Sequence, residues 1–453
     1  HFKKIFSLVP EHYHGNVLIF SEENNSRLTY TSRFIFNHVL GLNFRITNNS
    51  EEFQNVSGTR INYSDREMVS VFKIAPSGLM WQQGLLAQRP EAFYDQGHVQ
   101  FFRTEKKCDC GFDIFSAVFY FISRMEEWQT FKPDKHGRFE ASESILFEKA
   151  FYLKPVVDQW IIELGFALRR YYPEMILPEK KAKLLSTIDV DNLFAFKEKG
   201  TLRTAGAIAR DLMKRDIAQL KERIAVLKGR KKDPFDVYDD VTAFCEEFQI
   251  PLIYFFLLRT GTVHDRTVNP ARGAFADVLK KLASSSASVG LHPSYYSVVK
   301  PALFEEEIHQ LKKLIGKKVE LSRQHYLRFD IRNTPKVLAG SGIQVDFTMG
   351  YAATPGFRAG TSHPFYYYDF HSEQSGELLM VPFCVMDGVY IVYKNRDPES
   401  AMNDLMNLAA EIRLSGGYFI SVFHERSFSD HLYPGFGTLY KNLHLRINQL
   451  FNN

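Results

Sequence analysis

Acidic and histidine side chains recur at the ends of short apolar runs in the second half of the chain. The residues at these positions are Asp189, Asp191, His292, His325 and His424. A carboxylate together with neutral imidazoles forms a three-ligand metal site that leaves positions open for water, as a hydrolytic metal requires. A purely structural domain has no need of such residues at successive strand ends. The pattern therefore predicts a metal-dependent hydrolase.

Asp189 and Asp191 form an Asp-x-Asp pair at the end of the apolar run 184–190. In an extended segment the two side chains point to the same side, where they repel unless a cation lies between them or one of them is protonated. One can bind a metal while the other takes a proton from the attacking water. A solvated turn at a strand end shows the same pattern, so the pair alone does not establish a site.

His424, directly behind the apolar run 420–423, is a candidate for protonating a leaving group. A carboxylate beside a histidine sets its tautomer and raises its basicity. Asp346 or Asp430 is expected to supply that carboxylate.

Three arginines are expected to act on acids or on substrate. Arg323 or Arg328 could hold Asp189 as a carboxylate, and Arg358 lies in a loop with two glycines, where it pairs with an acid or with the substrate. No G-x-x-x-x-G-K pattern accompanies that loop, so it indicates a tight turn and not a phosphate cradle.

The second half of the chain alternates short apolar strands with helices, which is typical of parallel β/α architecture. Functional residues in such folds stand at the carboxyl ends of the strands, where the loops converge. The predicted strands are 184–190, 251–257, 288–292, 319–321, 343–347 and 418–423, and the predicted helices are 217–227, 237–248, 273–282, 303–314, 334–339 and 401–414.

The first part of the chain is predicted to be a smaller mixed α/β domain. Pro173, Pro178 and the charged run 179–183 end it, which places a domain boundary at about residue 180. The N-terminal domain then spans 1–180 and the β/α domain 181–453. In the first domain we expect strands at 17–20, 59–63 and 71–75, and helices at 28–42, 112–125 and 160–171.

Composition narrows the class of protein. The 453 residues, 45% hydrophobic and 24% charged, suffice for a large core over two or three domains. The net charge of +4, from 56 Lys and Arg against 52 Asp and Glu, does not indicate nucleic acid. No apolar run approaches the roughly 18 residues of a membrane span, and residues 1–10 lack a signal-peptide cleavage pattern. Four cysteines exclude a disulfide scaffold and predict a reducing, cytoplasmic location.

The order of five motifs resembles that of the polysaccharide deacetylases of the NodB-homology class, carbohydrate esterase family four. These motifs are Thr187-Ile-Asp-Val-Asp191, Gly290-Leu-His-Pro-Ser294, the segment 323–328, Val345-Asp-Phe-Thr-Met-Gly350 and Val422-Phe-His424. Three further segments are similar to a divergent bacterial branch with an extra N-terminal domain: 119–125, 134–139 and 155–160. The resemblance implies an α/β fold with a distorted (β/α)7 barrel that removes N-acetyl groups from an amino-sugar-containing carbohydrate.

The resemblance also implies roles for single residues. Asp191, His292 and a third ligand would hold a divalent metal, with zinc the first candidate. Asp189 would take the proton of the attacking water, and His424 would give one to the departing amine. The implied catalytic set is Asp189, His424, Arg323, Arg328 and Asp346, and the residues expected to contact the sugar are Ser294, Tyr296 and Arg358.

The third metal ligand is where the chain departs from the motif. The histidine usually found four residues after the first falls on Tyr296, which is a poor ligand. His325, at the next strand end, is our choice, and His264 is the alternative. If neither binds metal, the protein is a catalytically impaired relative that acts as a glycan-binding or assembly module. A glycosidase is disfavoured, because Asp189 and Asp191 on one strand lie too close to flank a glycosidic bond.

The aromatic run 365–368, Phe-Tyr-Tyr-Tyr, has two interpretations. It could stack against a sugar ring as a platform. Equally, it could be a β-rich edge that packs against the insertion 377–385.

Overall fold

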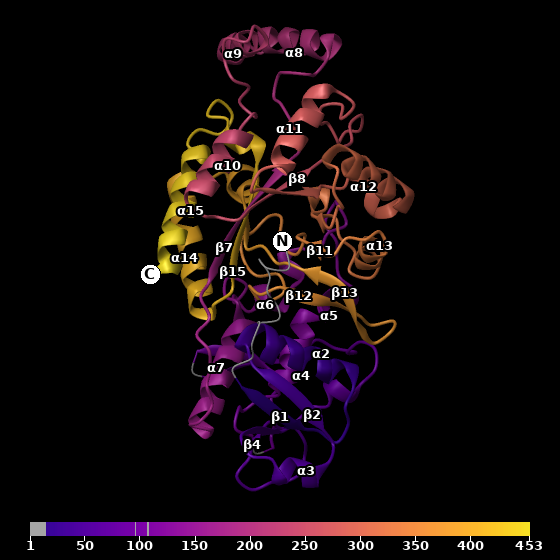
Figure 1. Cartoon of the computed structure of the whole chain (residues 1–453), viewed down its shortest axis with the longest axis vertical. Coiled ribbons are helices and arrows are strands. Elements are labelled where there is room, and N and C mark those ends of the chain that lie inside the picture. The colour runs from indigo at the N-terminus through magenta and orange to yellow at the C-terminus, as the bar shows by residue number, and fades with distance from the viewer. Residues whose placement is uncertain (1–14, 96, 107) are drawn as a thin grey trace.

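The computed structural model describes residues 15–95, 97–106 and 108–453. The expectation about a signal peptide concerns residues 1–10, which lie outside the described residues. The chain forms two parts that follow one another along the long axis of the molecule (Figure 1). The N-terminal part lies at one end of this axis, and a large sheet with its helices occupies the rest (Figure 1). The site described below belongs to the large sheet.

The N-terminal part contains helices and strands around a four-stranded parallel sheet in the order β2-β1-β3-β4. A separate antiparallel hairpin, β5 with β6, completes it. Its strands are β1 (Asn16–Phe20), β2 (Asn43–Thr47), β3 (Thr59–Asn62), β4 (Phe72–Lys73), β5 (Ala92–Asp95) and β6 (His98–Phe101). Its helices are α2 (Ser26–Ser32), η1 (Arg33–Leu40), α3 (Ser50–Asn55), η2 (Leu79–Trp81), α4 (Ile114–Ile122), α5 (Met125–Trp128), η3 (Ala141–Glu143), α6 (Ile145–Glu148) and α7 (Val156–Tyr171).

Helix α4 is the centre of this part. Its nine residues, from Ile114 to Ile122, are all buried. A helix that is apolar on nearly every face has to be buried on nearly every face. Asp113 caps its first turn by accepting a hydrogen bond from the backbone N–H of Ser116 at 3.1 Å. The hydroxyl of Tyr63, behind β3, donates to the same carboxylate at 3.0 Å. The cap therefore also ties the helix to the sheet.

The second part is built on one sheet of nine strands in the order β12-β13-β11-β10-β9-β8-β7-β15-β14. Every neighbouring pair is parallel except β12 with β13, so the predicted α/β class is confirmed. The strands are β7 (Lys183–Val190), β8 (Leu252–Phe256), β9 (Ser288–Leu291), β10 (Leu321–Ser322), β11 (Val345–Asp346), β12 (Phe365–Asp369), β13 (Gln374–Met380), β14 (Val385–Met386) and β15 (Tyr418–His424).

The sheet differs from the implied ring of seven strands. Among the described residues, β12 and β14 stand at the two ends of the sheet and do not pair with each other. The sheet is curled and open (Figure 1). The aromatic run 365–368 explains one of these ends, because it forms the antiparallel edge strand β12 against β13, with Phe365, Tyr367 and Tyr368 buried. The interpretation as a β-rich edge is thus confirmed. None of the residues 365–368 lines the cleft described below, so they form no sugar platform there.

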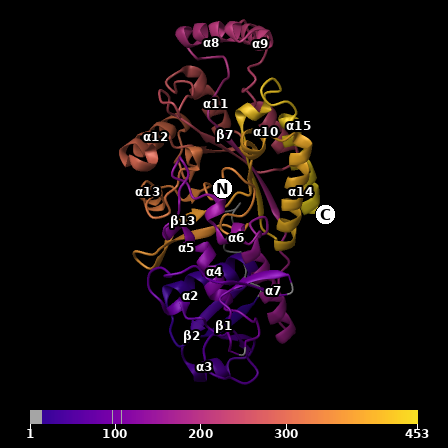
Figure 2. The same cartoon turned by 180° about the vertical axis from the view of Figure 1, so that it is seen from behind.

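Helices cover the sheet on its outer side (Figures 1 and 2). They are α10 (Tyr238–Glu247), α11 (Gly273–Ala283), α12 (Pro301–Ile315), α13 (Thr334–Gly340), α14 (Pro398–Ser415) and α15 (Phe436–Asn452). Short helical turns connect these elements: η4 (Ser297–Val299), η5 (His325–Leu327), η6 (Val389–Lys394) and η7 (Glu425–Phe428). Residues of η5, η6 and η7 line the cleft described below. Two more, α8 (Thr201–Met213) and α9 (Ile217–Leu227), form a hairpin at the end of the molecule farthest from the N-terminal part (Figure 1).

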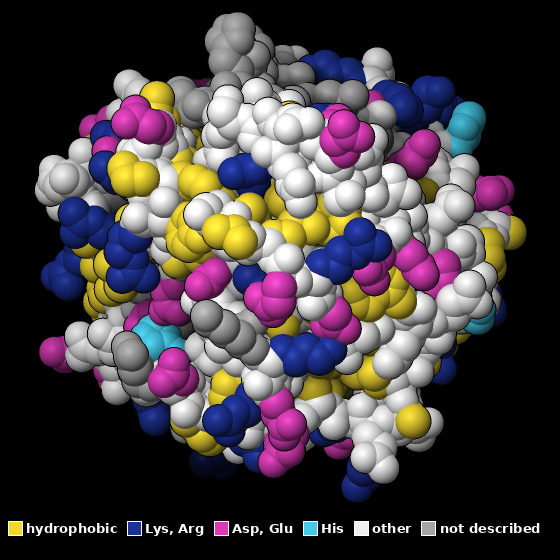
Figure 3. Space-filling view, turned by 90° about the horizontal axis from the view of Figure 1, so that it is seen from below, with side chains coloured by type: hydrophobic (Ala, Val, Ile, Leu, Met, Phe, Trp, Pro, Cys, Tyr) yellow, Lys and Arg dark blue, Asp and Glu magenta, His cyan; other side chains and the backbone are white. Residues whose placement is uncertain are grey.

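The two parts share one continuous hydrophobic core, and ion pairs join them. Arg27 of α2 pairs with Glu373 between β12 and β13 at 2.6 Å, and Glu127 of α5 pairs with Arg358 at 2.7 Å. The boundary at about residue 180 stays a prediction. On the outer end of the N-terminal part, acidic and basic side chains are interspersed with hydrophobic ones (Figure 3).

Two remaining expectations concern membranes and thiols. None of the helices in the described part of the chain combines the length and the apolar character that crossing a bilayer demands. The cysteines Cys108, Cys110, Cys245 and Cys384 are all free thiols.

Candidate metal centre

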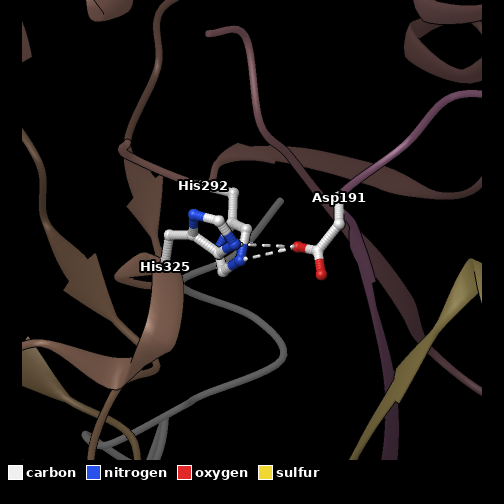
Figure 4. Close-up of side chains that lie close together, drawn as sticks. All are labelled: Asp191, His292 and His325. Atoms are coloured by element: carbon white, nitrogen blue, oxygen red, sulfur yellow. Dashed lines mark ion pairs between the residues drawn. The ribbon is translucent and has the colours of Figure 1, made fainter. Parts of the chain in front are cut away.

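Asp191, His292 and His325 converge at one point of the large sheet (Figure 4). One carboxylate oxygen and two imidazole nitrogens lie within 4.8 Å of one another. Asp191 Oδ1 is 3.4 Å from His292 Nε2 and 3.4 Å from His325 Nε2. The structure thus brings together the three residues that the sequence proposes as metal ligands.

Parallel pairing is what gathers these residues, because the carboxyl ends of parallel strands meet at one edge of a sheet. Asp191 follows β7 and His292 follows β9, while the backbone N–H of His292 donates to Phe256 at the end of β8 at 2.9 Å. His325 opens the turn behind β10, whose Ser322 pairs with Leu291 of β9.

Both histidines are held by their other ring nitrogen. His292 Nδ1 lies 2.6 Å from the backbone carbonyl of Arg323, which can only accept, so Nδ1 carries the proton. His325 Nδ1 lies 3.0 Å from a carboxylate oxygen of Asp265. Each contact sets the tautomer in which Nε2 presents its lone pair toward Asp191, as outer partners of metal-binding histidines do.

Asp191 has a free ligand atom. Its Oδ1 is buried and makes no hydrogen bond with any described residue, while its Oδ2 accepts from Arg426 at 2.6 Å. Burial raises the pKa of this carboxyl, but Arg426, His325 and His292 outweigh burial and hold the pKa well below its usual value. An unpartnered buried carboxylate oxygen beside two imidazole nitrogens fits a divalent cation, and this mixture of oxygen and nitrogen ligands suits zinc.

Asp189 lies beside this cluster. Its Oδ2 is 4.0 Å from His292 Nε2, and its Oδ1 accepts from the guanidinium of Arg323 at 2.8 Å. Arg323 is fully buried, donates to the Thr187 hydroxyl at 2.7 Å and lies 4.7 Å from the ring centre of Phe255. Of the two arginines proposed to hold Asp189, Arg323 is therefore the one in contact.

His424 stands on the other side, where β15 pairs with β7 and sets it opposite Asp189. Its Nε2 is 3.9 Å from Asp191 Oδ2, and its Nδ1 lies 2.7 Å from Asp387. Burial lowers the pKa of His424, but Asp387 more than reverses this and raises the pKa to about 9. The imidazole is therefore protonated at neutral pH and can donate.

The partner of His424 differs from both acids that the sequence proposes. Asp387, behind the two-residue strand β14, takes that place. Asp346 instead accepts from the Ser322 hydroxyl at 2.7 Å and from the backbone of Thr348 at 2.9 Å, and burial raises its pKa. Asp430 is exposed. Asp346 therefore stabilises the neighbouring strand ends and does not face the cluster.

Two arginines proposed for the site join the two parts of the molecule instead. Arg328 donates to the backbone carbonyl of His136 at 3.0 Å and stacks on Tyr295, with 4.1 Å to the ring centre. Arg358 is buried and donates to both carboxylate oxygens of Glu127 at 2.8 and 2.7 Å. Its partner is an acid and not a substrate.

The other proposed sugar contacts also lie elsewhere. Ser294 is buried, and its backbone N–H donates to Glu307 at 2.9 Å. Tyr296 is partly exposed but does not line the cleft above the metal cluster. His264 does line this cleft, stacked on Tyr295 with ring centres 3.8 Å apart, and is not part of the ligand cluster.

The cleft above the cluster has a volume of about 470 Å³. Sequence reasoning missed several residues around it. Asp265 stands behind β8, so the strand-end argument could have found it, and Arg426 lies two residues behind His424. The lining residues are Arg138, Asp189, Asp191, Asn192, Val263, His264, Arg266, His292, Gln324, His325, Tyr326, Leu327, Met386, Gly388, Val392, Tyr393, His424 and Arg426.

Comparison with known proteins adds the following. Residues 17–173 match a family described as a family of unknown function (DUF7033). No curated protein matches the chain. Similar solved structures include a proposed polysaccharide deacetylase from Mycobacterium smegmatis. The match has 16% sequence identity and a TM-score of 0.40, and it covers 60% of this chain and 86% of that chain. A peptidoglycan deacetylase from Bacillus subtilis has 10% identity, coverages of 61% and 87% and a TM-score of 0.31.

A CE4 family pseudoenzyme from Bacillus anthracis is also similar, with 9% identity, coverages of 59% and 62% and a TM-score of 0.30. Identities and TM-scores are low in all three cases. The functional assignment therefore depends on the geometry of the site.

Proposed function

We propose that this protein is a metal-dependent hydrolase that removes N-acyl groups, N-acetyl above all, from an amino-sugar-containing carbohydrate. The observation that carries the proposal is the buried cluster of Asp191, His292 and His325 in the cleft of about 470 Å³. These residues would hold the ion. A divalent cation there, with zinc as first candidate, would polarise the acyl carbonyl and make bound water more acidic.

The remaining side chains divide the proton transfers between them. Asp189, oriented by Arg323, would take the proton of the attacking water. His424, kept protonated by Asp387, would give a proton to the departing amine. The two groups are neighbours in register on the paired strands β7 and β15, so both lie beside the metal cluster.

His325 also bears on the alternative of a catalytically impaired protein. That alternative was motivated by Tyr296 at the place of the usual second histidine. Because His325 presents its Nε2 at 3.4 Å from Asp191, the cluster has two imidazoles without Tyr296. This geometry favours the enzyme.

The test combines metal analysis with an assay of acetate release from N-acetylated sugars. We expect about one equivalent of metal in the reconstituted protein, consistent with a single three-ligand site. Asp189→Asn should retain the metal and lose turnover by at least about a hundredfold, the lower end for a lost general base. Asp277→Asn, at an exposed position of α11, serves as the control. Full activity in Asp189→Asn would rule out the assigned base.

A further inference from the structure

A second pocket opens beside the metal cleft. Its volume is about 330 Å³, and it lies between the loop behind β7, the α8–α9 hairpin and the loop behind β15. Asn192 and Arg266 line both cavities. Asn192 directly follows Asp191, so the pocket begins one residue away from the proposed metal ligand. The pocket and the metal cleft therefore adjoin each other.

The pocket is lined by cations, most of which lack acidic partners. Lys199, Arg203, Arg210 and Arg266 all line it. None of them forms a direct ion pair with an acid in the described part of the chain, although Glu425 and Asp233 attract Lys199. Like charges gathered in a concave surface create a positive potential that attracts an anion. This arrangement differs from the interspersed charges at the opposite end of the molecule (Figure 3).

The other charged residues of the pocket do not offset these cations. Arg223 is buried and pairs with Asp211 at 2.7 Å, so these two charges balance each other. Glu222, on the same wall, already pairs with Lys231. His431 pairs with Asp216 at 3.4 Å. The pocket therefore keeps an excess of positive charge.

The walls of the pocket are held in place. Asp233 accepts hydrogen bonds from three successive backbone N–H groups, at residues 195–197, at 2.7, 2.9 and 3.1 Å. Arg223 of α9 lies 4.5 Å from the ring centre of Phe196 in that loop. Lys199 donates to Asn192 Oδ1 at 3.1 Å. The hairpin is thereby fixed to the loop that leaves the metal site.

We propose that this pocket binds a phosphate group carried by the sugar substrate. The inference rests on the proposed function, since it assigns a substrate class to the same enzyme. Arg203 and Arg210 on α8, Arg266 behind β8 and Lys199 before α8 surround the pocket from different directions of the chain. Several cations suit a group with more than one charge and several acceptor oxygens, and Arg and Lys are the usual partners of phosphate. The phosphate can be a sugar monoester or the pyrophosphate of an activated sugar, and the two sources are separated below.

The first test measures binding of pyrophosphate and inorganic phosphate by calorimetry, using the metal-loaded full chain. We expect Arg203→Ala/Arg210→Ala to weaken binding at least about tenfold, since each lost charge-assisted contact costs on the order of 1.5 kcal/mol or more. The matched control is Lys214→Ala/Lys221→Ala, which removes two exposed cations of the same hairpin outside the pocket. Equal affinities in both double variants, or equally tight binding of glucuronate, would overturn the proposal.

The second test compares kcat/KM for neutral and phosphorylated N-acetylated sugars. We expect Arg203→Ala/Arg210→Ala to lower kcat/KM about tenfold for the phosphorylated substrate and to leave the neutral one unchanged, because the lost contact is made only with phosphate. N-acetylglucosamine 1-phosphate represents the monoester, and a nucleoside diphosphate sugar represents the pyrophosphate. The form that shows the larger loss identifies the source.

The two proposals fail in different ways. If no sugar releases acetate while the double variant still loses pyrophosphate binding, the hydrolase is refuted and the phosphate pocket stands. If acetate is released and the double variant treats both substrates alike, the phosphate pocket is refuted and the hydrolase stands.

Discussion

The metal cleft and the neighbouring basic pocket hold charge in opposite ways, although they share Asn192 and Arg266. In the cleft the charged groups around the metal cluster have partners within 3 Å: Arg323 on Asp189, Arg426 on Asp191 and Asp387 on His424. In the pocket, Arg203, Arg210 and Arg266 have no acidic partner among the described residues, and Lys199 forms no direct ion pair there.

The difference separates groups that perform chemistry from groups that recognise a substrate. A reacting side chain must keep its orientation and protonation state before substrate arrives, and buried partners provide this. In a recognition site for an anion, the cations are left without partners in the free protein, because the ligand itself supplies the opposite charge. Substitutions in the cleft should therefore be costly in the free protein, and substitutions in the pocket only when the ligand is present.

The largest effect is expected at Asp191. Asp191→Ala removes the oxygen ligand and leaves Arg426 without its partner. We expect metal content to fall to a small fraction of an equivalent and turnover to fall at least about a thousandfold, beyond the roughly 10–100-fold loss typical of an outer partner. Elemental analysis and acetate release measure both. Asp277→Ala is the control, and a fully metal-loaded Asp191→Ala would contradict the ligand assignment.

The residues of this cleft differ in how far sequence could predict them. Asp191, His292 and His424 stand at the ends of β7, β9 and β15, which have four or more residues and a clear apolar run. Asp387 follows the two-residue strand β14, which is too short to show a period. That the sheet is curled and open could not be predicted from the sequence either, because the closure of a sheet depends on pairings between distant segments.

Sequence also cannot identify the partners of charged side chains when the two residues are far apart in the chain. Sequence places Arg358 in a loop but cannot show that Glu127, 231 residues earlier, is its partner. The same applies to Arg328, whose guanidinium reaches His136 of the N-terminal part. Arg328 is expected from the sequence to hold Asp189, and Arg358 to pair with an acid or with the substrate, because a sequence shows the arginine and not which distant segment packs against it.

The contrast between paired buried charges and exposed ones extends to stability. Arg358→Met leaves Glu127 buried without one of its two guanidinium partners, so we expect a loss of about 3 kcal/mol in the free energy of unfolding. Arg66→Met breaks an exposed pair with Glu22 and should cost less than about 1 kcal/mol. Denaturant unfolding compares the two. Equal losses would remove the distinction between buried and exposed charge.

A smaller effect is expected when His424 loses its partner. Asp387→Asn should bring the pKa of His424 down from about 9 toward its ordinary value near 6.5 and lower turnover roughly 10–100-fold. Because the pKa is raised in the folded protein, the associated stability is complete below about pH 6.5 and is lost as the pH rises through about 9.

Histidine NMR titration of the metal-free protein measures the pKa of His424, and unfolding at several pH values measures the pH dependence of the free energy of unfolding. In Asp387→Asn the loss of stability between neutral and alkaline pH should shrink. Asp430→Asn, at the exposed acid first proposed as the partner, should leave the titration of His424 unchanged. An unaltered titration in Asp387→Asn would show that another group sets this pKa.

The smallest effect is expected in the pocket without ligand. Arg203→Ala/Arg210→Ala removes two exposed, unpaired cations, so the free energy of unfolding should change by no more than about 0.5 kcal/mol. Pyrophosphate at ten times its Kd should then stabilise the unsubstituted protein by about 1.4 kcal/mol and the variant by clearly less. Thermal unfolding with and without pyrophosphate measures this difference. A variant that is stabilised as much as the unsubstituted protein would place the anion outside the pocket, and one that is already unstable without ligand would mean that these cations support the fold.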